Sequence, residues 1–148
     1  MILPISLTIA AAAALLHIWL SLRVSHLRRT HNVLIGDEGN RAVAARMRAH
    51  ANFAENMLPF LILLALVELG AGSPTWLWGV AFVFMVARIL HPLGMDRPAP
   101  NALRMGGAAA SWLILLGLAC YAIYLSYTAP TVSERLQLSP MQRAEAPF

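Results

Sequence analysis

The side chains best suited to chemistry in this sequence lie in one short segment, residues 48–55. Arg48, Asn52 and Glu55 are spaced i, i+4 and i+7, so a helix would carry them on one face. Arg41, one heptad earlier, extends the same stripe. The stripe offers guanidinium groups for carboxylates, an amide for hydrogen bonding and a carboxylate for an ammonium group. Ion pairing between membrane helices is the alternative use of the same residues.

Two later segments carry further ionisable residues that we expect near this stripe. Arg88 and His91 lie close to the end of one apolar segment, and Arg104 lies at the start of the next. An arginine in the first turn of a helix is opposed by the helix dipole, and a bound anion would remove that conflict. The residues therefore predict a site for a small ligand that carries carboxylates.

Glutathione suits such a site as a co-substrate, because it carries two carboxylates, an ammonium group and a thiol. An arginine near the sulfur would stabilise the thiolate, and lowering a thiol pKa from about 8.5 toward neutrality requires roughly 2 kcal/mol. A metal site is not expected, because no HxxxH or HxxE pattern joins His50 and His91 and the arginines would repel a cation.

Three further polar residues within apolar segments have structural interpretations. His17 is expected to be a hydrogen-bonded packing residue, and Glu68 an acid that reaches the membrane interface. Cys120, the single cysteine, excludes an intrachain disulfide and is expected to be a buried apolar thiol.

The elements that position these residues are predicted from hydropathy. The chain of 148 residues is 59% apolar and 12% charged, whereas an average soluble domain is about 25% charged. It is therefore expected to be an all-α integral membrane protein, a four-transmembrane-helix bundle over residues 1–127. The helices are expected at about 3–27, 40–69, 74–91 and 101–127. Pro92 should end the third helix, and residues 128–148 should form a weakly ordered tail.

The arginines also predict the orientation in the membrane. They gather around the first and third connections, whereas the connection at 70–74 has none. By the positive-inside rule, the first and third connections are cytoplasmic and both termini lie outside. This distribution explains the net charge of +4 without a nucleic-acid partner, which is not expected. A cleaved signal peptide is the alternative for the N-terminus, but residues 1–16 contain no basic residue.

One segment resembles a known family. Arg48-Ala-His-Ala-Asn-Phe-Ala-Glu-Asn-Met-Leu-Pro-Phe60 is similar to the second-helix signature of the MAPEG family, the membrane-associated proteins of eicosanoid and glutathione metabolism, and especially to its microsomal glutathione transferases. Gly36-Asp-Glu-Gly39, Arg88-Ile-Leu-His91 and Arg104-Met-Gly-Gly107 follow in the order expected of bacterial members. The resemblance extends over about residues 5–127.

The resemblance implies a homotrimer in the lipid bilayer, with glutathione sites between subunits that open toward the cytoplasm. It assigns glutathione binding to one set of residues, with either Arg23 or Arg28 as the cation from the first helix. The other members of that set are Arg48, Asn52, Glu55, Arg88 and His91. It assigns stabilisation of the thiolate, the catalytic role, to Arg104.

The resemblance also has departures that narrow the expected activity. Met95 and Ala108 stand where eicosanoid-forming members tend to carry tyrosines, which argues against prostaglandin or leukotriene synthesis. Ala51 stands where some members add a glutathione-binding arginine. The expected activity is that of a detoxifying glutathione transferase of the bacterial inner membrane, with glutathione peroxidase as a further activity, acting on lipophilic electrophiles. The alternatives are a non-catalytic lipid- or glutathione-binding scaffold of the same family and a small anion carrier.

Overall fold

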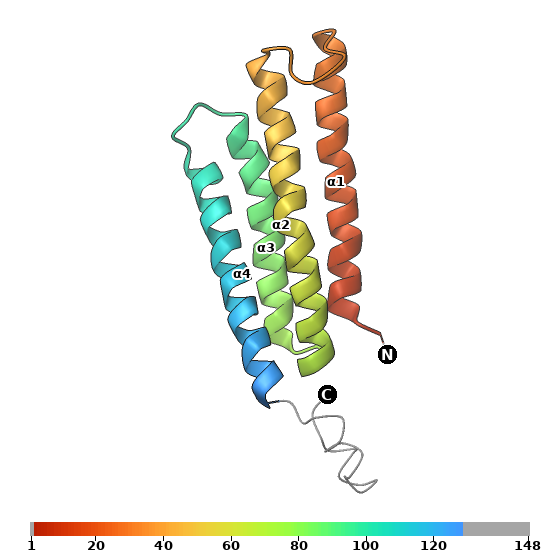
Figure 1. Ribbon diagram of the computed structural model, residues 1–148, viewed down its shortest axis with the longest axis vertical. Helices are drawn as coiled ribbons and strands as arrows, with labels where there is room; N and C mark the ends of the chain where they lie inside the picture. The colour runs from red at the N-terminus through yellow and green to blue at the C-terminus, as the bar shows by residue number, and fades with distance from the viewer. Residues whose placement is uncertain (1, 129–148) are drawn as a thin grey trace, which may run out of the picture.

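The protein is a bundle of long helices, and the computed structural model describes residues 2–128. Within this range the helices are α1 (Pro4–Thr30), α2 (Arg41–Ala71), α3 (Thr75–Met95) and α4 (Ala102–Thr128). They lie side by side and alternate in direction along the chain (Figure 1). Each is long and apolar enough to cross a membrane, and no strand occurs among the described residues. The predicted all-α membrane fold is confirmed.

Two helix ends differ by three or more residues from the sequence prediction. The first helix, predicted to end near Leu27, continues to Thr30. The prediction that α3 ends at His91 is wrong, because the helix passes through Pro92 and ends at Met95. A proline removes a single backbone donor, and membrane helices tolerate that loss where packing holds the helix in place. Here Pro92 and the glycine two residues later are both buried. The predicted tail falls almost entirely on 129–148, outside the described residues.

The capping residue Asn40 fixes the start of α2, which the sequence placed near residue 40. The Asn40 side-chain oxygen accepts hydrogen bonds from the backbone N–H groups of Ala42 (3.0 Å) and Val43 (3.2 Å). These are donors that have no partner within the first turn of a helix. The cap fixes the first residue of α2 and hence the helical register of the Arg48–Glu55 stripe.

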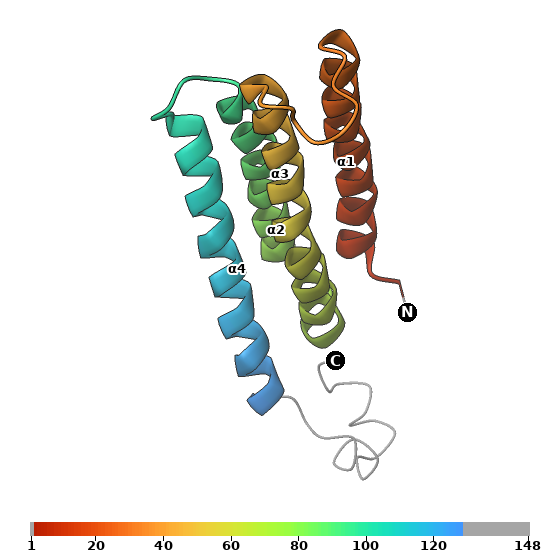
Figure 2. The same cartoon turned by 45° about the horizontal axis from the view of Figure 1, so that its top comes forward.

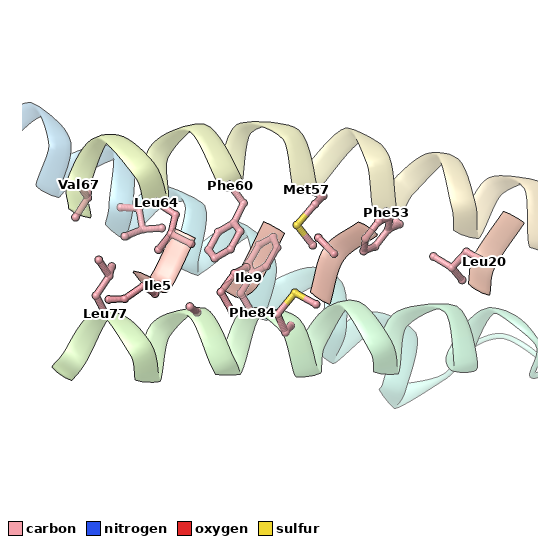
Figure 3. Packing of buried hydrophobic residues seen from close by; sticks show 14 residues of the cluster. Ile5, Ile9, Leu20, Phe53, Met57, Phe60, Leu64, Val67, Leu77 and Phe84 are labelled. Atoms are coloured by element: carbon pink, nitrogen blue, oxygen red, sulfur yellow. The ribbon is translucent and has the colours of Figure 1, made fainter. Parts of the chain in front are cut away.

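Apolar side chains from α1, α2 and α3 form the core (Figure 3). Phe60 of α2 stacks on Phe84 of α3, with ring centroids 3.6 Å apart and planes inclined by 4°. Ile5 and Ile9 of α1 and Leu64 of α2 are buried in the same cluster. These contacts fix how far α2 and α3 can slide past one another, which sets the level at which their polar residues meet.

The fourth helix packs against the bundle through a narrow stripe of two small residues and Leu118. Gly107 and Ser111 are buried, and a Cβ on Gly107 would lie 2.8 Å from the carbonyl oxygen of Ala87. The opposite face of α4 is apolar and exposed, as suits contact with lipid. Cys120 lies on an exposed part of α4, so the prediction that its thiol is buried is wrong. The narrow packing stripe leaves most of this helix uncovered.

Glu68 is not the interfacial acid that the sequence suggested, because its side chain is only 1% exposed. Its Oε1 accepts from the Ile5 N–H (2.9 Å) and the Ser73 hydroxyl (2.7 Å). Its Oε2 accepts from the N–H (2.7 Å) and the hydroxyl (2.6 Å) of Ser6. One carboxylate therefore caps the N-terminus of α1 and ties it to the turn between α2 and α3.

We expect Glu68→Ala to destabilise the bundle by on the order of 2 kcal/mol, because it leaves two backbone N–H groups of α1 and two hydroxyls without their acceptor. The measurement is thermal unfolding in detergent, followed by circular dichroism. Ser126→Ala is the control, because that exposed hydroxyl bonds only within its own helix. An equal melting temperature for the two variants would contradict the capping role.

Candidate functional site

A small cavity of about 90 Å³ lies between α2, α3 and α4. It is at the end of the bundle that carries the α1–α2 and α3–α4 connections (Figure 1). The residues that line it are Arg48, Ala51, Asn52, Glu55, His91, Met95 and Arg104. The structure therefore brings together five of the predicted site residues from three helices, although they are distant in the sequence.

The α2 stripe supplies one wall of the cavity. Arg48 and Glu55 are exposed in the single chain, whereas Asn52 between them is half-buried. Because they occupy successive turns of one helix face, their charged groups lie on either side of the amide. The wall can thus meet a negative group at one end and a positive group at the other. Arg41, on the same stripe, is not among the lining residues.

Arg88 lies behind this wall and is not among the lining residues. Its side chain is 1% exposed, and its guanidinium donates to the Asn52 side-chain oxygen (3.0 Å) and to the Gly107 carbonyl oxygen (2.9 Å). It therefore joins α2 to α4 from within α3. Because its bond uses the amide oxygen of Asn52, it holds the Asn52 side chain in a fixed orientation, with the amide N–H₂ free to face another group.

Arg104 is placed by a close contact between two backbones. A Cβ on Gly94 would lie 2.4 Å from the Arg104 backbone nitrogen, so the end of α3 touches the first turn of α4. One turn further along α4, a Cβ on Gly107 would lie 3.0 Å from the His91 Cβ. His91 is 6% exposed and lines the cavity. Glycines thus bring the His91 imidazole and the Arg104 guanidinium to one cavity.

Arg23, one of the two candidates for the α1 cation, is engaged elsewhere. It forms an ion pair with Asp96, whose other oxygen lies 3.6 Å from Nε of Arg46. Arg46 also donates to the Arg23 carbonyl oxygen (3.3 Å), so α1, α2 and the end of α3 are joined. Sequence reasoning did not foresee this cluster. The sequence contained one indication of this cluster: Asp96 is the only acidic residue between Glu68 and Glu134.

Arg28, the other candidate, lies at a second hollow of about 320 Å³ between α1 and α2. This hollow is lined by Ser21, Val24, Ser25, Arg28, Met47, His50 and Ala51. Ala51 lines both hollows, so the two lie on adjoining sides of α2. Arg28 donates to the Gly36 carbonyl oxygen (2.9 Å), which ties it to the α1–α2 connection.

His50 also pairs with His17 of α1. Its Nε2 lies 3.2 Å from Nδ1 of His17, so the predicted hydrogen bond of His17 is present, but the His17 side chain is exposed in the single chain and not packed inside the bundle. Within residues 2–128, no three His, Cys, Asp or Glu side chains are grouped as they would be around a metal ion.

The fold and the site define an integral membrane protein of four helices with an arginine-rich cavity at one end of the bundle. Residues 6–124 match the MAPEG family, so the chain belongs to that family, as the second-helix signature predicted. No curated protein matches the chain in sequence. The family includes glutathione transferases and also members without catalytic activity.

Proposed function

We propose that this protein is a membrane-bound glutathione transferase that joins glutathione to lipophilic electrophiles, with glutathione peroxidase as a further activity of the same site. The observation that carries the proposal is the convergence of Arg48, Asn52, Glu55, His91 and Arg104 on one cavity. Membership of the MAPEG family supports it, because glutathione transferases occur in that family.

Each lining group has a role that its chemistry suits. Arg48 would pair with a glutathione carboxylate, and Glu55 with the ammonium group. The Asn52 amide, oriented by Arg88, would bond the peptide backbone of glutathione. Arg104 would lie near the sulfur and stabilise the thiolate. The thiolate would then form a carbon–sulfur bond with the electrophile, whose leaving group departs with the bonding electrons, and no covalent intermediate with the enzyme is needed.

We also infer that the site is completed by another copy in a homotrimer. The cavity of about 90 Å³ is smaller than the roughly 300–1,000 Å³ typical of small-molecule sites. His17, Arg48 and Glu55 are exposed on α1 and α2, and ionisable groups facing lipid are costly, so a protein partner is expected there. The hollow that contains Arg28 would then face the cavity of the neighbouring copy. Arg28 is therefore the proposed α1 ligand, because Arg23 is already paired with Asp96.

The positive-inside rule supports a cytoplasmic site. Arginines surround the connections at the cavity end, and the α2–α3 turn at the opposite end has none. We accordingly propose the bacterial inner membrane as the location, with glutathione entering from the cytoplasm and the electrophile from the bilayer.

Glutathione titration of the purified protein tests the proposed site. We expect Glu55→Gln and Arg28→Gln each to weaken binding about tenfold, because each removes one charge-assisted contact. Arg23→Gln is the matched control, and it should change the affinity much less. Calorimetry measures the affinity, and size-exclusion chromatography checks the assembly. A variant could instead lose the assembly while the protein that stays folded binds glutathione with unchanged affinity. That result would show that the substituted residue forms a structural ion pair and does not bind glutathione. Binding without turnover of any model electrophile would identify a non-catalytic scaffold.

A further inference from the structure

The α1–α2 connection, residues 31–40, exposes two large apolar side chains outside the helices. Leu34 is 85% exposed and Ile35 is 83% exposed. The loop that carries them is fixed by its own hydrogen bonds. Oε1 of Glu38 accepts from the backbone N–H groups of Leu34 (3.0 Å) and Ile35 (3.4 Å). A fixed loop that presents adjacent apolar side chains is suited to contact with an apolar surface.

The depth of this loop is set by the way α1 ends. Asn32 has a φ of 56°, and the Val33 N–H donates back to the Arg28 carbonyl oxygen (2.9 Å), so the chain reverses direction. The Arg28 guanidinium also bonds the Gly36 carbonyl oxygen, which keeps the loop level with the last turns of α1. Figure 2 shows the connection turning back beside the end of α1 before it reaches α2.

Those last turns of α1 belong at the membrane interface. The helix has 27 residues and is therefore about 40 Å long, whereas the hydrocarbon core is about 30 Å thick. Even at an average tilt of about 20°, the helix is longer than the core is thick, so part of it extends into a headgroup region. The basic residues of its last turn, Arg28 and Arg29, mark the end that does so.

The charges around the loop favour anionic headgroups. Arg29 and Arg41 are exposed on either side of it, and within residues 2–128 neither forms an ion pair with an acid. The two acids of the loop bond to the loop's own backbone. Glu38 accepts from Leu34 as described above, and Asp37 accepts from the Gly39 N–H (3.2 Å). Guanidinium groups at this depth attract anionic lipids.

We propose that the α1–α2 connection is an interfacial anchor, in which Leu34 and Ile35 enter the boundary between headgroups and acyl chains while Arg29 and Arg41 bind anionic phospholipid headgroups. The proposal does not depend on glutathione chemistry. It has a consequence for the site, because Arg28 contacts both this loop and the second hollow.

The first test places a fluorophore on the loop of the full-length protein in nanodiscs that contain phosphatidylglycerol. Ile35→Cys in a Cys120→Ala background carries the label, and Leu113→Cys on the exposed face of α4 is the reference for lipid contact. We expect lipids spin-labelled near the headgroup to quench the Ile35 label at least twofold more than water-soluble iodide does. Dominant quenching by iodide would overturn the proposal. So would cross-linking of position 35 to a second copy, because it would show that protein covers the loop.

The second test measures the headgroup preference. We expect the double variant Arg29→Gln/Arg41→Gln to have a severalfold lower preference for phosphatidylglycerol over phosphatidylcholine. The measurement is the fraction of each spin-labelled lipid whose motion the protein restricts. Arg29→Lys with Arg41→Lys is the matched control, and it should retain the preference because the charge is kept. An unchanged preference in the glutamine variant would overturn the role of the two arginines.

Discussion

Replacing Arg104 by alanine is expected to raise the apparent pKa of the thiol of bound glutathione by about one unit or more and to lower turnover by about 100-fold. The reason is position: Arg104 lines the cavity at the start of α4, held there by the contact with Gly94. Binding should weaken less, because Arg48, Asn52 and Glu55 remain in the α2 wall. The measurements are thiolate absorbance against pH and single-turnover rates at saturating glutathione.

Two further variants make this result specific. Arg104→Lys should recover part of the rate, because lysine keeps the charge but not the planar fork of the guanidinium. Arg97→Ala removes an exposed arginine of the α3–α4 connection that does not line the cavity, and it should leave the rate and the thiol pKa unchanged. If Arg104→Ala formed thiolate at the same pH and the same rate as the wild type, Arg104 would be an interfacial arginine and the proposed mechanism would be wrong.

Gly94→Ala is expected to lower activity although Gly94 itself does not line the cavity. The added Cβ would lie 2.4 Å from the Arg104 nitrogen and 2.9 Å from its Cα, and backbone atoms cannot move aside as a flexible side chain can. The first turn of α4 must therefore shift. We expect a loss of about 1–3 kcal/mol in stability, typical of overpacking, together with a rise in the thiol pKa in the same direction as for Arg104→Ala.

Gly106→Ala provides the matched control for that result. It lies on α4 two residues after Arg104, and a Cβ there meets nothing within 4 Å. Alanine favours helix over glycine by about 1 kcal/mol, so this variant should be as stable as the wild type or more so. Thermal unfolding and thiolate absorbance compare the pair. Equal thiol pKa values for the alanine variants at positions 94 and 106 would show that the position of Arg104 is not set by Gly94.

The sequence by itself determined the features that arise within one helix. Hydropathy predicted four membrane-spanning helices, because a span needs only local apolar residues. Spacing predicted that Arg48, Asn52 and Glu55 share a face, because helical geometry depends only on neighbours along the chain. The start of the second helix near residue 40 was predicted for the same reason. The family followed from this second helix and is confirmed over residues 6–124.

Only the tertiary structure decided which polar groups partner one another across helices. Arg23 belongs to Asp96, Arg88 lies behind Asn52, and Glu68 caps a helix more than sixty residues away along the chain. Each of these choices depends on the rotation and the level at which two helices pack. Those are set by contacts such as the stacked Phe60 and Phe84 rings, which join distant segments and leave no periodic pattern in the sequence. The arginines could therefore be identified from the sequence, but their partners could not be assigned.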